Sequence, residues 1–266
     1  MQFGLTVPIF DDLADPALLA DLAADAEAHG WDGCFVWDHV RYREPVLAAT
    51  DPWIALAAIA ARTERLTIGP MVTPLARRRP QIVARQAVAI DQLSGGRMVL
   101  GVGLGLDASG QEFTRFGEEA DPVRRAEMLD ESLDVLTALF SGDAVTHHGP
   151  HFHVHDVAFR PTPVTGHLPI WVAARWPNRR PLRRAARFDG VFVIDLQPGQ
   201  LPAVLEVLDA HRSGDLRDYD VVVHDVVGAD PQPWVDAGAT WLLTTFDAFT
   251  VDVERVRSCV RAGPRR

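Results

Sequence analysis

The stretch that decides the fold is LTIGPMVTPLARRRPQIVARQAVAIDQLSGGRMVLGVGLG, residues 66–105. Its two ends, residues 66–72 and 97–102, are short apolar runs with little alternation, which is typical of strands buried on both faces. Between them apolar residues recur with a helical period, Pro80 suits a first helical turn, and Gly95 follows as a C-cap. A strand, a helix and a strand within about 40 residues predict a βαβ unit with parallel strands.

The same alternation of strand-like and helix-like segments continues along the whole chain. The other strands are predicted at residues 2–8, 32–37, 169–173, 190–194, 220–224 and 240–244, and the other helices at 16–29, 53–63, 181–188, 201–211, 233–237 and 251–260, with one more that starts at Pro122. Because eight alternations follow without a linker, we predict a single α/β domain over residues 1–266, a (β/α)8 TIM barrel. The alternating segment 144–159 predicts a short hairpin between the fourth helix and the fifth strand.

Composition and motifs exclude several other classes of protein. The chain has 266 residues, of which 47% are hydrophobic, and its formal charge of −10 argues against general nucleic-acid binding. Residues 101–107 lack the third glycine of a dinucleotide fingerprint, so an open doubly wound sheet is not favoured. Cys34 and Cys259 have neither metal-ligand nor redox spacing. The first residues do not form a signal peptide, and no apolar run approaches the ~20 residues that span a bilayer, so we expect a soluble cytoplasmic protein.

A barrel of this kind carries its active site at the carboxyl ends of its strands. His39, after the second strand, is the candidate that transfers a proton, and Asp38 is a candidate for orienting it, although neighbouring strand residues face opposite ways. A histidine bonded to a neighbouring loop is an equally weighted alternative. The strand ends offer no nucleophile and no dense carboxylate cluster. This mix favours a pocket for a flat apolar cofactor with an anionic tail over a hydrolase site.

Six arginines lie between the fifth and sixth predicted strands: Arg175, Arg179, Arg180, Arg183, Arg184 and Arg187. We interpret Arg175 and Arg179 as candidate phosphate ligands in the loop, because guanidinium groups beside a helix N-terminus form such sites. The last three are expected on a solvated helix face. The histidines of the predicted hairpin have only Asp156 as a local carboxylate, so we expect an exposed hairpin face and no metal.

Several motifs, taken in order, resemble the bacterial luciferase-like monooxygenase superfamily. They are FVWDH at 35–39, IGPMVTP at 68–74, LSGGR at 93–97, GVGLG at 101–105, PIWV at 169–172, LRRAA at 182–186 and AGATW at 237–241. The resemblance covers nearly the whole chain, and the LSGGR and GVGLG pair is its most specific part.

The resemblance implies a (β/α)8 barrel that binds FMN or a deazaflavin coenzyme, coenzyme F-420, at the carboxyl ends of the strands. It implies an oxidoreductase that either transfers a hydride between the reduced cofactor and a small organic substrate or uses the cofactor for monooxygenation. By the same resemblance His39 is an acid or base beside the ring, and a cis peptide at Pro70–Met71 backs the ring. The cofactor-binding candidates are Gly69, Pro70, Met71, Thr73, Gly103, Leu104, Gly105, Ala174, Arg175, Asn178 and Arg179.

Three departures from the family pattern limit what the resemblance implies. Leu106 stands where sugar-phosphate dehydrogenases of the family carry a catalytic glutamate, and the chain is short for the family. Ala173-Ala174-Arg175 replaces the small, glycine-rich turn often seen after the fifth strand, so phosphate binding is expected to depend more on arginine. The choice between FMN and deazaflavin stays open. We expect a bacterial homodimer, served by a separate flavin reductase if FMN is the cofactor. The alternative from another functional class is a non-catalytic barrel that binds flavin weakly or serves as an assembly subunit.

Overall fold

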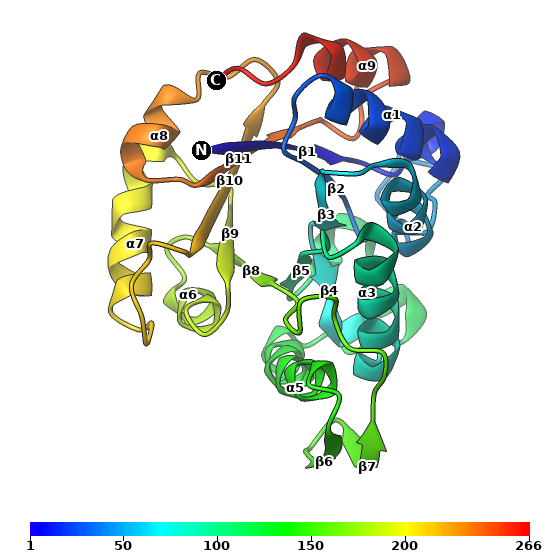
Figure 1. Ribbon diagram of the computed structural model, residues 1–266, viewed down its shortest axis with the longest axis vertical. Coiled ribbons are helices and arrows are strands. Elements are labelled where there is room, and N and C mark those ends of the chain that lie inside the picture. Colours follow the sequence, from blue (N-terminus) through cyan, green and yellow to red (C-terminus); the bar gives the residue numbers. More distant parts are fainter.

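In this computed structural model, parallel strands curl into a nearly closed barrel with the helices outside it (Figure 1). The structure describes residues 1–266, except for the side chains at positions 109 and 110. The sheet order is β3-β2-β1-β11-β10-β9-β8-β5-β4. Its strands are β1 (Gln2–Val7), β2 (Gly33–Val36), β3 (Thr67–Pro70), β4 (Thr73–Pro74), β5 (Leu100–Gly103), β8 (Ile170–Arg175), β9 (Gly190–Ile194), β10 (Asp220–Val226) and β11 (Trp241–Thr245). The predicted (β/α)8 barrel is confirmed.

The helices lie between successive strands. They are α1 (Pro16–Ala28), α2 (Pro52–Arg62), α3 (Pro80–Ser94), α4 (Asp107–Gly110), α5 (Pro122–Phe140), α6 (Arg179–Ala185), α7 (Leu201–Asp209), α8 (Gln232–Ala237) and α9 (Val253–Ala262). Asp51 caps α2 and Asp121 caps α5, and a proline follows each cap at the first helical position. Helix α6 begins at Arg179, two residues earlier than predicted, because the Asn178 side chain accepts a hydrogen bond from the Arg180 N–H and caps it.

The barrel closes between β3 and the residues that lead into β5. The Ile68 N–H donates to the Arg97 carbonyl at 3.0 Å, and the Val99 N–H donates to the Ile68 carbonyl at 2.8 Å. The strand predicted at residues 66–72 is interrupted, because pairing with β2 ends at Pro70 and pairing with β5 begins at Thr73. The segment from Thr67 to Pro74 thus pairs with β2 through its first half and with β5 through its second half.

The expected position of the non-prolyl cis peptide is wrong by one residue. The cis bond joins Met71 to Val72, and not Pro70 to Met71. The Met71 N–H still donates to the Val36 carbonyl at 2.8 Å, so the hydrogen bonding with β2 continues through Met71.

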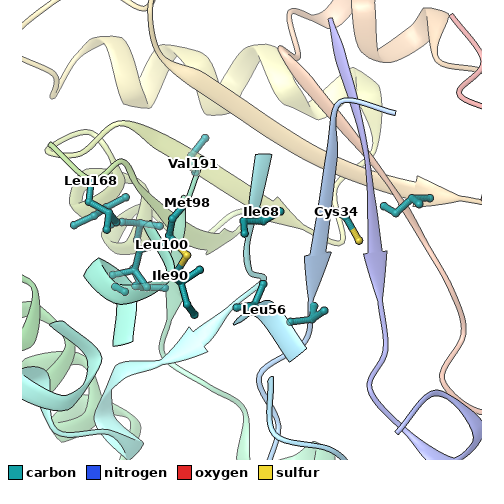
Figure 2. Packing of buried hydrophobic residues seen from close by; sticks show 14 of the residues in the cluster. Cys34, Leu56, Ile68, Ile90, Met98, Leu100, Leu168 and Val191 are labelled. Carbon is teal, nitrogen blue, oxygen red and sulfur yellow. The ribbon is translucent and has the colours of Figure 1, made fainter. Parts of the chain in front are cut away.

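Alternation along the strands divides the apolar side chains into two cores. One fills the barrel: Phe35, Met71, Val99, Trp171, Phe192, Val222, Trp241 and Leu243. The other lies between the sheet and the helices. Figure 2 shows part of this outer core, with Cys34, Ile68, Leu100 and Val191 from the strands beside Leu56 and Ile90 from α2 and α3. Both faces of the strands are thus buried, as the apolar runs predict.

The predicted hairpin forms from β6 (Ala144–His148) and β7 (His153–Ala158), which pair antiparallel and project away from the barrel (Figure 1). His153 and His155 are exposed on it. Across the side chains that the structure describes, no three His, Cys, Asp or Glu residues gather as they would around a metal ion. None of the described helices has the length and apolar character that crossing a membrane requires.

The closure of the barrel depends on a glycine. A Cβ atom at Gly69 would lie 2.0 Å from the Val99 carbonyl oxygen, and backbone cannot yield as a flexible side chain does. We predict that Gly69→Ala lowers the free energy of unfolding by about 3 kcal/mol in urea denaturation followed by tryptophan fluorescence. Gly214→Ala is the control, since its Cβ would meet open space. Equal losses in the two variants would contradict this account of closure.

Candidate functional site

His39 lies just beyond the carboxyl end of β2, where its ring is held by a carboxylate. Its Nδ1 atom is 2.7 Å from Oε2 of Glu112, which comes from the segment between β5 and α5. The side chain of His39 is 23% exposed, whereas that of Glu112 is 1% exposed. The His39 ring is therefore partly exposed to solvent, while its Nδ1 atom contacts a buried carboxylate.

Glu112 is fixed on both oxygens. Its Oε1 accepts a hydrogen bond from the Val40 N–H at 2.7 Å and also pairs with Arg77. Burial raises the pKa of the Glu112 carboxyl, but the hydrogen bond and charge of His39, the charge of Arg77 and the Val40 amide together hold that pKa below its ordinary value. Glu112 is therefore an ionised hydrogen-bond acceptor near neutral pH.

The backbone around Glu112 is anchored on either side. Oδ1 of Asp107 accepts hydrogen bonds from the Phe113 N–H at 2.8 Å and the Thr114 N–H at 3.3 Å. The Phe113 ring is fully buried, with the Arg125 guanidinium 4.2 Å from its centroid. The segment between β5 and α5 thus presents Glu112 to His39 at a fixed place.

Arg77 joins the carboxylate of Glu112 to that of Asp38. Its Nη2 donates to Asp38 Oδ1 at 2.8 Å and to the Asp38 carbonyl at 2.9 Å, while its Nη1 pairs with Glu112. Asp38 therefore contacts Arg77 and not His39, and its influence on His39 passes through Arg77 and Glu112. The hypothesis that Asp38 orients His39 by direct contact is not supported by this placement.

The Asp38 carboxylate is fully buried, and four side chains donate to it. Besides Arg77, they are Arg78 at 2.9 Å, Thr73 at 2.8 Å and the Trp53 indole at 3.1 Å. Burial raises the pKa of Asp38, but the charges of Arg78 and Arg77 with the hydrogen bonds from Arg78 and Thr73 hold it below its ordinary value. The Thr73 hydroxyl is thus used as a donor to Asp38.

The Glu112 carboxylate determines which nitrogen of His39 can react. An ionised carboxylate only accepts hydrogen bonds, so Nδ1 must carry the hydrogen between the two groups. Nε2 makes no hydrogen bond to the part of the chain that the structure describes. In the neutral imidazole Nε2 is then an acceptor, and in the charged form it is a donor, which suits it to move a proton to or from a substrate oxygen.

Aromatic rings cover one side of His39. Tyr42 meets its ring edge-on at a centroid distance of 5.1 Å, and Phe10 and Trp37 lie at 5.8 and 6.1 Å. Phe249, from the segment after β11, lies 5.8 Å from Tyr42. We call Phe10, Trp37, Tyr42 and Phe249 the aromatic wall.

Very small side chains line the barrel mouth at the ends of β5 and β8. A Cβ atom at Gly103 would lie 2.7 Å from Val72 and 3.3 Å from Ala173, so the absence of a side chain lets these two residues pack closely against β5. Gly105 has φ +73°, and a Cβ there would meet the Phe113 ring at 2.7 Å. A closely packed, largely apolar strand end beside an imidazole fits one face of a flat ring system such as a flavin or deazaflavin.

The other candidates near strands β3 and β8 have different surroundings. Met71 lies in the barrel core, whereas Pro70 is buried and Gly69 serves barrel closure. The Ala174 side chain lies in the outer core against the helices, so only its backbone remains a candidate for cofactor contact. Leu104 is half-buried beyond β5.

The basic segment after β8 is only partly what the sequence predicts. Arg175 is half exposed and pairs with Asp195, while Arg179 is exposed in the first turn of α6. Arg184 was expected on a solvated face, and that expectation is wrong. Its guanidinium is only 11% exposed and donates through Nε and Nη2 to both carboxylate oxygens of Asp130 on α5.

His224 is a second imidazole at the mouth. Its Nε2 accepts a hydrogen bond from the Asp195 N–H at 3.1 Å, which assigns the hydrogen to Nδ1. Burial lowers the pKa of His224, and the weaker effects of Asp225, which raises it, and Arg175, which lowers it, leave it below its ordinary value. This histidine is held neutral near neutral pH.

Sequence reasoning missed Glu112 and the bridging role of Arg77. Glu112 sits in a polar segment without periodicity, 73 residues from His39. Arg77 was visible only as one member of the run Arg77–Arg78–Arg79 at a strand end. The sequence feature that could have predicted this contact is that the arginine run and the Asp38-His39 pair both follow strands that lie near each other in the barrel.

A family model described as luciferase-like monooxygenase matches residues 1–232. The chain belongs to this family.

Two curated relatives illustrate the range of the luciferase-like family. An F420-dependent glucose-6-phosphate dehydrogenase from Nakamurella multipartita is 33% identical over 166 residues, 61% of this chain and 48% of that protein. A phthiodiolone/phenolphthiodiolone dimycocerosates ketoreductase from Mycobacterium bovis is 30% identical over 244 residues, 82% of this chain and 62% of that protein. The chain thus spans between about half and two-thirds of the length of these relatives.

A solved structure shares the fold over nearly the full length. An F420-dependent secondary alcohol dehydrogenase in complex with an F420-acetone adduct superposes with a TM-score of 0.82 at 17% identity, over 98% of this chain and 97% of that one. At this identity the comparison establishes the barrel and not the chemistry.

The Asp38 network makes a testable contribution to the stability of this luciferase-like barrel. Asp38→Asn removes the charge that neutralises two buried guanidinium groups, so we expect the free energy of unfolding to fall by about 3 kcal/mol at pH 7 in urea denaturation. Asp21→Asn is the control, because the Asp21–Arg62 pair is about two-thirds exposed and its loss should cost under about 1 kcal/mol.

The same difference should depend on pH in one direction. The folded-state pKa of Asp38 is depressed, so its stabilisation is complete above the ordinary aspartate value of about 4 and is lost as the pH falls through the folded-state pKa. A gap between wild type and Asp38→Asn that persists unchanged into strong acid would contradict this assignment.

Proposed function

We propose that this protein is a deazaflavin-dependent oxidoreductase that moves a hydride between coenzyme F-420 and the carbonyl or alcohol carbon of a small organic substrate. The observation that carries the proposal is the partly exposed imidazole of His39, held through Nδ1 by buried Glu112 so that Nε2 is left without a hydrogen bond to the described chain. Curated relatives named as F420-dependent support the cofactor class.

His39 and its partners would handle the proton. When a carbonyl is reduced, Nε2 of charged His39 donates a proton to the substrate oxygen, and when an alcohol is oxidised, neutral Nε2 accepts it. Glu112 stabilises the charged imidazole and keeps Nε2 pointing outward. The bound deazaflavin supplies or accepts the hydride, which no side chain can do.

The residues proposed to hold the cofactor fall into two groups. The backbone from Gly103 to Gly105, with Leu104 between them, would lie against the ring, and the segment from Gly69 to Met71 would back it. Arg175, Asn178 and Arg179, with the backbone of Ala174, would bind the anionic tail. Thr73 and Asp38 would act by positioning.

The finer parts of the proposal concern partners and setting. We propose one catalytic domain over residues 1–266, working as a homodimer in the bacterial cytoplasm, since homodimers are the commonest oligomers and the matched relatives are bacterial. If FMN is the cofactor instead, the protein would activate oxygen and would receive reduced FMN from a separate flavin reductase.

Titration of the purified protein with coenzyme F-420 and, separately, with FMN tests the proposal through cofactor fluorescence. We expect F-420 to bind more tightly. His39→Ala should keep this affinity within about threefold but lower turnover with a carbonyl or alcohol substrate by about 10²–10⁴-fold, the usual contribution of a positioned acid or base. His29→Ala is the control, because His29 bonds locally to the Asp25 carbonyl at the end of α1.

Two results would overturn parts of this assignment. Tight binding of FMN alone would replace the deazaflavin reaction with flavin chemistry. Binding of neither cofactor would favour a non-catalytic barrel.

A further inference from the structure

We propose that the substrate accepted beside His39 is a neutral molecule with an apolar body, selected by Tyr42 and Phe249 of the aromatic wall. This inference rests on the proposed function for the reaction, but the preference for a neutral, apolar ligand can be measured by binding alone. It names a substrate class, an uncharged ketone or secondary alcohol with an aromatic or alkyl substituent, and two residues that determine specificity.

The geometry of the aromatic wall is the first support. Tyr42 stands between the reactive histidine and the outer rim, edge-on to His39 at 5.1 Å and inclined to Phe249 at 5.8 Å. Phe10 stacks on the other side of Tyr42 at 4.7 Å and 25° and keeps its ring in place. A substrate whose oxygen reaches Nε2 of His39 must lay its remaining atoms along rings with almost no hydrogen-bonding groups.

Exposed apolar side chains extend this wall around the mouth. Val40 follows β2, Leu106 follows β5 and Phe249 follows β11, and each is exposed. Because carboxyl ends of parallel strands meet at one end of a barrel, these residues share the rim. Apolar groups gathered at the opening of a site mark contact with an apolar ligand more often than with a sugar or an ion.

The third support is that the two arginines joined to the network around His39 are already paired with carboxylates. Arg77 pairs with the buried carboxylates of Asp38 and Glu112, and Arg78 pairs with Asp38. A phosphate or carboxylate on the substrate would have to displace one of these contacts.

Ligand-observed NMR titration of the full chain tests the inference without any reaction. The probes are 4-phenyl-2-butanone, which is neutral and aromatic, and glucose 6-phosphate. We expect the ketone to bind at least tenfold more tightly than the sugar phosphate, and Phe249→Ser to weaken ketone binding about fivefold or more.

Phe159→Ser is the matched control. Phe159 is also a partly exposed ring under a guanidinium, that of Arg85 at 4.0 Å, but it lies beside the hairpin and outside the aromatic wall. Its substitution should leave the affinity for the ketone unchanged.

The outcomes separate this inference from the proposed function. Sugar phosphate binding as tight as ketone binding, or equal effects of Phe249→Ser and Phe159→Ser, would overturn the apolar substrate class even if coenzyme F-420 binds. Ketone binding that follows the expected pattern without any binding of F-420 would support the apolar site and contradict the deazaflavin reaction.

Discussion

The Arg77 guanidinium, shared between two buried carboxylates, is the interaction on which the rest of the site depends. A buried charge is tolerated only when it is paired and hydrogen-bonded, and here one cation satisfies Asp38 after β2 and Glu112 beyond β5. Arg77 itself comes from the segment after β4. Three strand ends that are distant in sequence are thereby tied together at the barrel mouth, and His39 takes its orientation from this junction.

The barrel supplies the frame for that junction through close backbone approach. Gly69 and Gly101 allow β3 and the chain before β5 to lie so near each other that a Cβ at either position would overlap a carbonyl oxygen. With the ring closed there, the ends of β2, β4 and β5 are adjacent, and Arg77 can span them. The short distance from His39 to Glu112 is thus a consequence of barrel closure.

The fold could be predicted from the sequence because its signals are local. Apolar runs, Asp-Pro helix starts and the Gly95 cap act within a few residues, and each is present in the structure. The site could be predicted only in part. His39 was recognisable from its place at a strand end, but its partner Glu112 depends on a contact across 73 residues that no spacing reveals. The burial of Arg184 against Asp130 was missed for the same reason.

The central claim is that Glu112 holds the Nδ1 hydrogen of His39 and leaves Nε2 for chemistry. Long-range ¹H–¹⁵N NMR of protein labelled at histidine nitrogens, assigned with a His39→Gln variant, measures this tautomer directly at a pH where the imidazole is neutral. We expect a protonated Nδ1 and an unprotonated Nε2 in the wild type. A neutral His39 that carries its hydrogen on Nε2 would contradict it.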